Sequence, residues 1–197
     1  TGVQTIQEVA KTAETLTVFQ RRPNWCAPLH NARITPEEQP ALKARYPEIF
    51  QRCRETFACF LHTPDPRSAL EVSDEEREAF WEQRYSEPGF GIWQGNFRDV
   101  MIDRTSNKML SDFVAGKIRQ RVADPETAEK LIPKDHGFGT RRVPLETKYY
   151  EVYNQPNVRL VDAIATPIER ITPTGLETGA EAFEFDMIIY ATGFDAI

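Results

Sequence analysis

The chain has 197 residues, 40% of them hydrophobic and 27% charged, which is enough to bury a sizeable core in one globular domain. Lys and Arg number 24 against 30 Asp and Glu, so the formal net charge is −6 and no overall positive field attracts nucleic acid or anionic lipid. The longest apolar stretch, 187–194, is far shorter than the roughly 20 residues of a membrane helix. No secretory signal pattern opens the chain, so we expect a cytoplasmic protein without nucleic-acid or membrane partners.

The three cysteines, Cys26, Cys53 and Cys59, are odd in number and lack C-x-x-C spacing. This pattern disfavours a disulfide framework, a zinc cluster and the redox pair of a disulfide reductase. We interpret the cysteines as small buried hydrophobes. His136 stands apart from the other histidines without a ligand pattern, so no metal site is expected.

The first segment predicts a helix followed closely by a strand. Ile6, Val9 and Ala13 recur at helical spacing, so the helix should begin at residue 2 or 3. Residues 16–20, a short apolar run of β-favouring residues, predict a buried parallel strand. Because this order is the back half of a βαβ unit, we expect its front strand to lie before Gly2 in a longer chain.

The middle of the chain predicts helices. Capping boxes mark two helix starts, at Thr35 and at Ser73, and Pro47 should divide the first of these helices. Further amphipathic helices are expected over 113–122 and from Pro125 to just before Pro133. Residues 87–93, rich in glycine and aromatic side chains, favour a packed hinge loop over a ligand-binding wall.

Strand patterns dominate after residue 157. The expected elements are a strand over 158–162, a hairpin of 168–171 and 176–178, a short strand over 183–185, and a buried strand over 187–191. The last strand ends in Thr192-Gly193, where backbone can approach a ligand closely. The sequence therefore predicts an α/β fold at both ends with a helical insertion between them.

Two arginines follow the first predicted strand. In a dinucleotide-binding βαβ unit, the second strand ends at the adenosine ribose roughly 20 residues after the last glycine of G-x-G-x-x-G. Arg21 stands 19 residues after Gly2, and Arg22 follows it, where an NAD enzyme is expected to place Asp or Glu. Guanidinium groups suit a 2′-phosphate, which points to NADP. A solvated strand end explains these arginines about equally well.

A second concentration of positive charge lies in the loop from Asp135 to Arg142. Gly137 and Gly139 allow its backbone to fold close to a cofactor, and the adjacent Arg141 and Arg142 can serve two different anions. A solvated basic turn is the alternative that these residues leave open.

The sequence resembles the NADPH-binding domain of type I Baeyer-Villiger monooxygenases, flavoproteins related to cyclohexanone and phenylacetone monooxygenases. Matching segments occur in order along both ends and much of the middle; they are 1–4, 16–21, 23–25, 134–136, 138–142, 149–151, 157–162 and 186–196. The resemblance implies a Rossmann-like fold of the two-dinucleotide-binding flavoprotein type. It divides the chain into a first part of the NADP-binding domain with a truncated βαβ unit (1–34), a helical insertion (35–132), and a second part that returns toward an FAD domain (133–197).

By this resemblance, Arg142 occupies the position of the family's catalytic arginine. Cofactor-binding positions match at eight residues: Thr1, Gly2, Gln4, Arg21, Arg22, Arg141, Thr192 and Gly193. Arg141 stands where lysine is usual, and Arg22 stands where a small hydroxyl residue is common, so the preference for NADPH over NADH is open. The helix start at Gly2 suits the pyrophosphate, because backbone amides and the helix dipole favour an anion there.

The resemblance implies an enzyme that uses NADPH, FAD and O₂ to insert one oxygen atom next to a ketone carbonyl, giving an ester or lactone. FAD would be bound mainly by portions of the parent chain outside these residues, so the segment alone is expected to be inactive. A relative that hydroxylates nitrogen or sulfur centres shares the fold, although the Arg142 loop favours ketone oxidation. A non-catalytic NADP-binding module is the alternative from another class.

Overall fold

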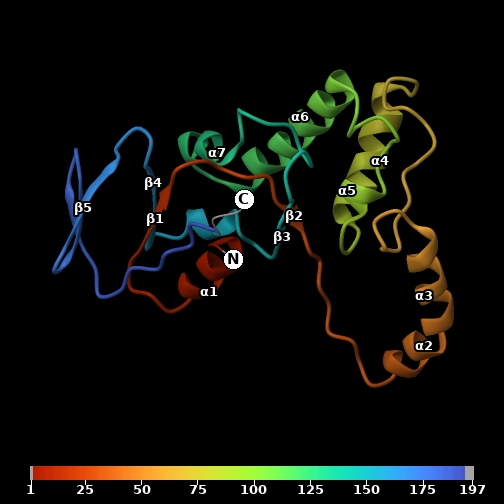
Figure 1. Cartoon of the computed structure of the whole chain (residues 1–197), viewed down its shortest axis with the longest axis horizontal. Coiled ribbons are helices and arrows are strands. Elements are labelled where there is room, and N and C mark those ends of the chain that lie inside the picture. Colours follow the sequence, from red (N-terminus) through yellow and green to blue (C-terminus); the bar gives the residue numbers. More distant parts are fainter. Residues whose placement is uncertain (1, 194–197) are drawn as a thin grey trace. The chain divides into compact units, whose positions relative to one another are not determined.

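The computed structural model describes residues 2–193 and has a mixed α/β fold (Figure 1). Contacts between Cα atoms divide the chain into two compact units. Unit 1 consists of 1–24, 115–135 and 148–197, and unit 2 consists of 25–114 and 136–147. These units group residues by contact density and not by function, so the functional segments 1–34, 35–132 and 133–197 stay a prediction.

Helices occupy most of the middle of the chain. Their bounds are α1 Gly2–Val9, α2 Glu38–Ala44, α3 Tyr46–Glu55, α4 Asp74–Ser86, α5 Gly91–Gln94, α6 Arg104–Arg121, α7 Pro125–Leu131 and the 3₁₀ helix η1 Glu151–Asn154. The elements between Glu38 and Leu131 are all helices, as the sequence predicts for this region.

The strands form three small sheets among the described residues. Their bounds are β1 Leu16–Gln20, β2 Ala27–Pro28, β3 Leu145–Glu146, β4 Val158–Asp162, β5 Ile168–Thr172, β6 Gly175–Thr178 and β7 Ala182–Glu184. β1 pairs with β4 in parallel, β2 with β3 in parallel, and β5, β6 and β7 form an antiparallel sheet. The parallel direction predicted for the first strand is confirmed, but its residues are half-buried and not buried as predicted.

The hydrogen bonds expected at the two predicted helix starts are present, although α2 begins at Glu38, later than the Thr35 N-cap predicted. The amide of Glu38 donates to Thr35 Oγ1 at 3.2 Å while Glu38 Oε2 accepts from the amide of Thr35 at 2.9 Å, which is a complete capping box. Ser73 Oγ accepts from the amide of Glu76 at 3.2 Å. Pro47 lies at the start of α3, immediately after α2 ends, because proline fits the first turn of a helix.

The predicted buried strand over 187–191 is wrong for the described chain. These residues form no strand, and Met187 and Tyr190 are 73% and 70% exposed. A strand needs a neighbour for its backbone amides, and within residues 2–193 the parallel sheet of unit 1 contains only β1 and β4. Residues 187–191 therefore have the apolar pattern of a strand but pair with no strand among the described residues.

Two smaller predictions need correction. Residues 87–93 are not a loop throughout, since the short helix α5 begins at Gly91 with the amide of Gln94 donating to the carbonyl of Phe90. Cys26 is buried as expected, but Cys53 is half-buried and Cys59 is exposed. The apolar neighbours of Cys59 do not cover it, because Phe57 and Phe60 are themselves exposed.

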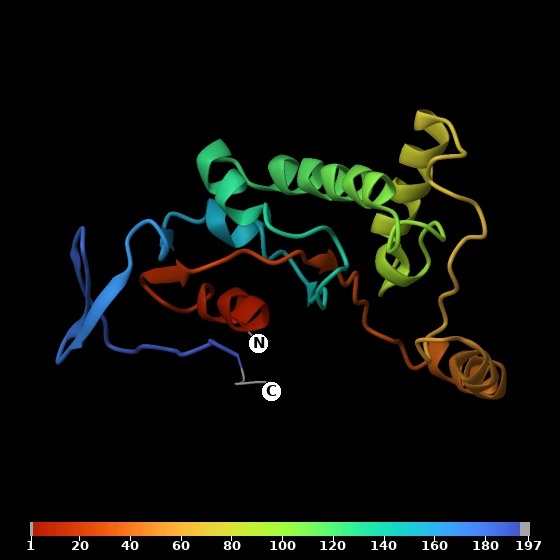
Figure 2. The same ribbon diagram turned by 45° about the horizontal axis from the view of Figure 1, so that its top comes forward.

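The core of unit 1 lies where β1 and β4 meet the antiparallel sheet. Phe19 of β1 packs edge-on against Phe183 of β7, with ring centroids 5.0 Å apart, and Val161 and Leu176 complete the cluster. Figure 2 shows the last described residues running alongside α1. Asn157 ties the end of α1 to β4, since its side-chain amide donates to the carbonyls of residues 10 and 13.

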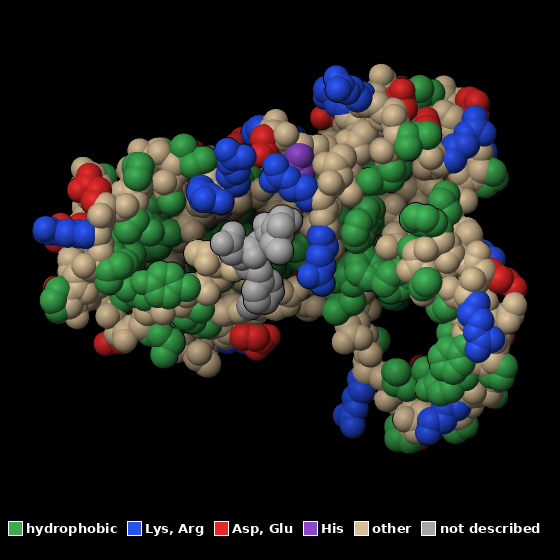
Figure 3. Space-filling model, in the orientation of Figure 1, with side chains coloured by type: hydrophobic (Ala, Val, Ile, Leu, Met, Phe, Trp, Pro, Cys, Tyr) green, Lys and Arg blue, Asp and Glu red, His purple; other side chains and the backbone are tan. Residues whose placement is uncertain are grey.

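The core of unit 2 is built from helices α4 to α6. Trp81 contacts Phe97 and Phe113, and its indole Nε1 donates to the buried Asn96 Oδ1 at 2.9 Å. By contrast, hydrophobic side chains remain at the surface on and after α3, including Phe50 and Phe57 (Figure 3). Among the described helices, none is both long and apolar enough to cross a membrane.

Candidate active site

The N-terminus of α1 lies beside the last described residues of unit 1. A Cβ atom added at Gly2 would stand 3.5 Å from Cβ of Ala191, so the helix start and the segment before Thr192 are in contact. No acidic residue occupies the first turn of α1. Gln4 is exposed on this turn, and Thr1 lies outside the described residues. The first turn of α1 thus places no carboxylate of its own beside the amide end of the helix.

Gly193 has a backbone conformation that favours glycine. Its φ is +89°, in the left-handed region, although an added Cβ would meet nothing within 4 Å. The requirement for glycine is thus conformational and not steric. The sequence predicted a tight exit at Thr192-Gly193, and the positive φ agrees with it.

Arg21 and Arg22 follow β1 directly, and both are exposed. The strand end is held in place, because Gln20 Nε2 donates to the carbonyl of Lys130 at 2.8 Å. Arg22 forms an ion pair with Asp135, with 3.3 Å between Nη1 and Oδ2. Within residues 2–193, Arg21 makes no hydrogen bond or ion pair. Of the two arginines, Arg21 is thus the one whose charge is fully available to a ligand.

The loop that precedes Arg141 is fixed by hydrogen bonds inside unit 2. Asn107 of α6 donates through Nδ2 to the carbonyls of Val100 at 2.8 Å and Phe138 at 2.9 Å. The amide of Phe138 donates to Ser111 Oγ, also on α6, at 2.9 Å. Trp25 Nε1 donates to the carbonyl of His136 at 3.0 Å. The loop is therefore held at two residues, His136 and Phe138, by side chains of two other segments.

Both glycines of this loop are required by its close packing. A Cβ atom at Gly137 would overlap Oδ1 of Asn107. A Cβ atom at Gly139, whose φ is +79°, would approach Met101 Sδ and the indole of Trp93 to 2.9 Å. The glycines thus let the loop lie against α6 and Trp93, whereas the sequence suggested only that they allow approach to a cofactor.

Arg141 and Arg142 are exposed at the end of this fixed loop. Val143, the next residue, is buried, and the chain then enters β3, which pairs with β2. The loop is thus anchored on both sides of the two arginines. Such anchoring limits the movement of the backbone that carries them, which is what a positioned cation requires.

Sequence reasoning found the arginines and the glycines but missed the residues that hold the loop. Asn107, Ser111 and Trp25 are separated from it by many residues, and no local pattern links them to it. The two glycines beside Phe138 were interpreted as allowing approach to a cofactor, so their packing against Asn107 and Trp93 was not predicted. Among the described residues, no group of three His, Cys, Asp or Glu side chains could hold a metal ion.

The chain is similar over its whole length to known monooxygenases. The 2-oxo-Δ3-4,5,5-trimethylcyclopentenylacetyl-CoA monooxygenase of Pseudomonas putida is 54% identical over all 197 residues, which cover 36% of its length. A Baeyer-Villiger monooxygenase of Pseudooceanicola batsensis is 40% identical, again over the whole chain and 36% of the relative. Homologues that match the whole chain are thus Baeyer-Villiger monooxygenases, of which it corresponds to a segment. No family model matches the sequence.

A solved structure that is similar in sequence agrees with the fold. The crystal structure of OTEMO in complex with FAD and NADP superposes with a TM-score of 0.96 at 54% identity, over 98% of this chain and 36% of that one. The chain thus spans about a third of the length of these monooxygenases. Its fold is that of the corresponding segment.

Proposed function

We propose that the chain is the NADPH-binding segment of an FAD-dependent Baeyer-Villiger monooxygenase. The parent enzyme would insert one oxygen atom of O₂ next to the carbonyl of a small-molecule ketone, giving an ester or lactone. The observation that carries this proposal is the match along the whole chain to such monooxygenases, including one solved with FAD and NADP. FAD would be held mainly by portions of the parent chain outside residues 1–197.

The residues of unit 1 fit an NADP-binding domain of the Rossmann type. β1 and β4 are parallel and in register, and α1 leads into β1, which is the order of a dinucleotide-binding unit. The amide end of α1 at Gly2 carries no acidic side chain in its first turn, so it suits a pyrophosphate. The contact between Gly2 and Ala191 supports a role for Thr192 and Gly193 at the same place.

Recognition of the 2′-phosphate would fall mainly to Arg21 and Arg141. Arg21 is exposed and has no partner among the described residues, so its guanidinium is available for bidentate binding. Arg22 contributes less, because Asp135 already neutralises part of its charge. Arg141 places a planar guanidinium where the family commonly has lysine, which retains the charge and changes its shape.

Arg142 would act as the catalytic cation. When bound, NADPH and FAD supply the reducing equivalents and the activation of O₂. Arg142 would stabilise the negative charge that develops on the substrate carbonyl oxygen, because a guanidinium cannot lose its proton near neutral pH and donates directed hydrogen bonds. The anchoring of the loop at Phe138 and Val143 would hold this cation in place before the reaction begins.

A cytoplasmic location is part of the proposal. The three cysteines of the chain are free and Cys59 is exposed, which is typical of proteins in a reducing compartment.

The test is purification of the full-length enzyme and analysis of its products. We expect a yellow protein with bound flavin that consumes NADPH in the presence of a ketone and releases an ester. Release of N-oxide or sulfoxide from nitrogen or sulfur substrates, with no ester from any ketone, would instead assign hydroxylation. A colourless protein that binds NADPH without turnover would assign a non-catalytic module.

A further inference from the structure

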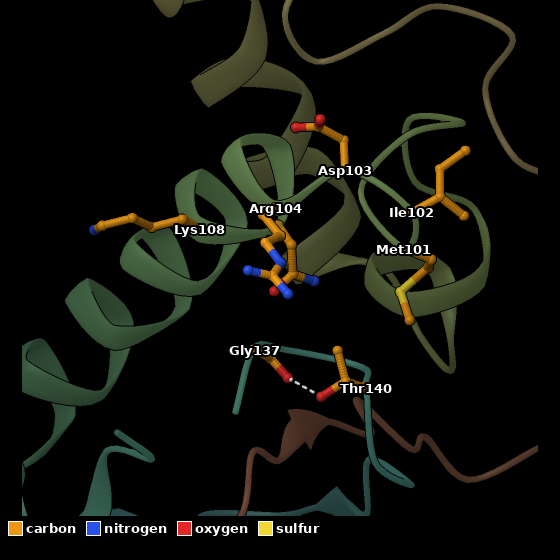
Figure 4. Close-up of a pocket in the computed structure, with 8 residues that line it drawn as sticks. Met101, Ile102, Asp103, Arg104, Lys108, Gly137 and Thr140 are labelled. Carbon is orange, nitrogen blue, oxygen red and sulfur yellow. Dashed lines mark hydrogen bonds between the residues drawn. The ribbon is translucent and has the colours of Figure 1, made fainter. Parts of the chain in front are cut away.

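A pocket of about 250 Å³ opens in unit 2 between the start of α6 and the loop that precedes Arg141 (Figure 4). Its lining residues are Met101, Ile102, Asp103, Arg104, Asn107, Lys108, Gly137 and Thr140. The loop wall is fixed by the hydrogen bonds of Asn107 described above. One wall of the pocket is therefore held in place by hydrogen bonds within unit 2.

Most polar groups of the pocket already have partners. Asp103 Oδ1 accepts from the amides of Thr105 and Ser106, both at 2.9 Å. The hydroxyl of Thr140 donates to the carbonyl of Gly137 at 2.9 Å. Lys108 forms an ion pair of 2.6 Å with Asp112. These groups therefore do not need a ligand to complete their hydrogen bonds.

Arg104 differs from them. Within residues 2–193 its guanidinium makes no hydrogen bond and no ion pair, and Figure 4 shows it extending from α6 toward the segment that carries Gly137 and Thr140. The pocket also has two apolar lining residues just before α6, Met101 and Ile102, and both are exposed. A cation with apolar side chains in the same pocket suits a molecule that has both a hydrocarbon skeleton and an anionic group.

The pocket shares its loop with the proposed catalytic arginine. Thr140 lines the pocket and Arg142 is two residues further on, so their Cα atoms are at most about 7 Å apart. A molecule bound at Arg104 would therefore lie beside the loop that carries Arg142.

We propose that Arg104 binds an oxyanion, a carboxylate or a phosphate, carried by the ketone substrate away from its carbonyl. This inference rests on the proposed function and names its substrate class as anionic ketones. Arg104 acts in binding only, so its removal should raise KM for such ketones without lowering kcat.

The test uses the full-length, flavin-loaded enzyme and three matched ketones. These are a cyclopentanone bearing a carboxymethyl group, its uncharged methyl ester, and its coenzyme A thioester. In Arg104→Ala, KM for an anionic ketone should rise roughly 10-fold, as expected for the loss of a hydrogen bond to a charged group, while KM for the methyl ester stays unchanged. Arg104→Lys, which keeps the charge but not the planar fork, should retain part of the affinity.

The control is Arg54→Ala, which removes the same side chain from an exposed position on α3 outside the pocket and should change no KM. A rise in KM for the acid assigns a carboxylate, and a rise for the thioester alone assigns the phosphates of coenzyme A. Equal effects on charged and neutral ketones, no effect on either, or a rise in KM for NADPH alone would overturn the inference. Failure of the wild-type enzyme to oxidise any ketone would instead overturn the proposed function.

Discussion

The loop 136–142 and the stretch 187–193 both carry residues predicted for the cofactor site. Side chains of the described chain form hydrogen bonds to the loop, whereas the stretch has no strand to pair with there. The loop is fixed by Asn107, Ser111 and Trp25 of its own unit. The stretch forms no strand, and its apolar side chains are exposed, as at Tyr190. The comparison teaches that an apolar pattern specifies a structure only where the described chain also supplies the surface that covers it.

The largest expected effect on stability is at Asp99, which accepts a hydrogen bond from Ser106 in the first turn of α6. Asp99 Oδ2 accepts from Ser68 Oγ and Ser106 Oγ at 2.6 Å, and Oδ1 accepts from the amide of Ala69 at 2.9 Å. Asp99→Asn should lower the free energy of unfolding by about 3 kcal/mol, because hydrogen bonds to a charged group are lost. Chemical denaturation of the full-length enzyme at neutral pH measures this change.

The same carboxylate predicts a pH dependence. Burial opposes the ionisation of Asp99, but the hydrogen bonds from Ser106, Ser68 and the amide of Ala69 outweigh it and lower its pKa. Because the pKa is lower in the folded state, this stabilisation is fully present above the unfolded value of about 4 and is lost as pH falls through the folded pKa. The difference between wild type and Asp99→Asn should therefore shrink below about pH 4. A constant difference would contradict this account.

Gly137→Ala should have the next largest effect. The new methyl group would overlap Asn107 Oδ1, and Asn107 cannot move without losing its bonds to the carbonyls of Val100 and Phe138. We expect a loss of about 2 kcal/mol in stability, with lower turnover because Arg142 is displaced. Gly116→Ala is the matched control on α6, where an added Cβ meets nothing within 4 Å, and it should stabilise by about 0.5 kcal/mol. Equal thermal midpoints for the two variants would refute the packing argument.

A smaller effect is expected at the end of β1. Arg21→Ala should raise KM for NADPH about 10-fold and leave KM for NADH unchanged, since only NADPH carries the 2′-phosphate. Arg22→Ala should raise KM for NADPH less, because Asp135 shares the charge of Arg22. Steady-state kinetics with both cofactors decide between the two. A greater effect at Arg22 than at Arg21 would show that the ion pair with Asp135 is not retained with cofactor bound.

The smallest expected effect is a difference in hydrogen exchange at residues 187–191. In the full-length enzyme we expect the amides of 187–191 to be protected from hydrogen exchange about as well as those of β4, because the predicted strand would find its neighbour there. Exchange at the rate of an unstructured peptide would show that the stretch is not a strand in the parent protein either.

Local signals in the sequence predicted much of this fold. The capping box at Thr35, the proline at the start of α7 and the β-favouring run at 158–162 each depend on residues close in sequence, and each predicted element is present. The pairing of β2 with β3, and the bond from Asn107 to the carbonyl of Phe138, join distant segments and leave no local pattern. For the same reason the sequence located the arginines of the candidate site but not what fixes them.

The central claim is that the fixed loop presents Arg142 as the cation of ketone oxidation, and one variant tests it most directly. In the full-length enzyme, Arg142→Ala should lower ketone oxidation by roughly 100-fold or more, as for the loss of a preorganised oxyanion donor, while bound flavin is retained and is still reduced by NADPH. Near-normal formation of ester by Arg142→Ala would contradict the account.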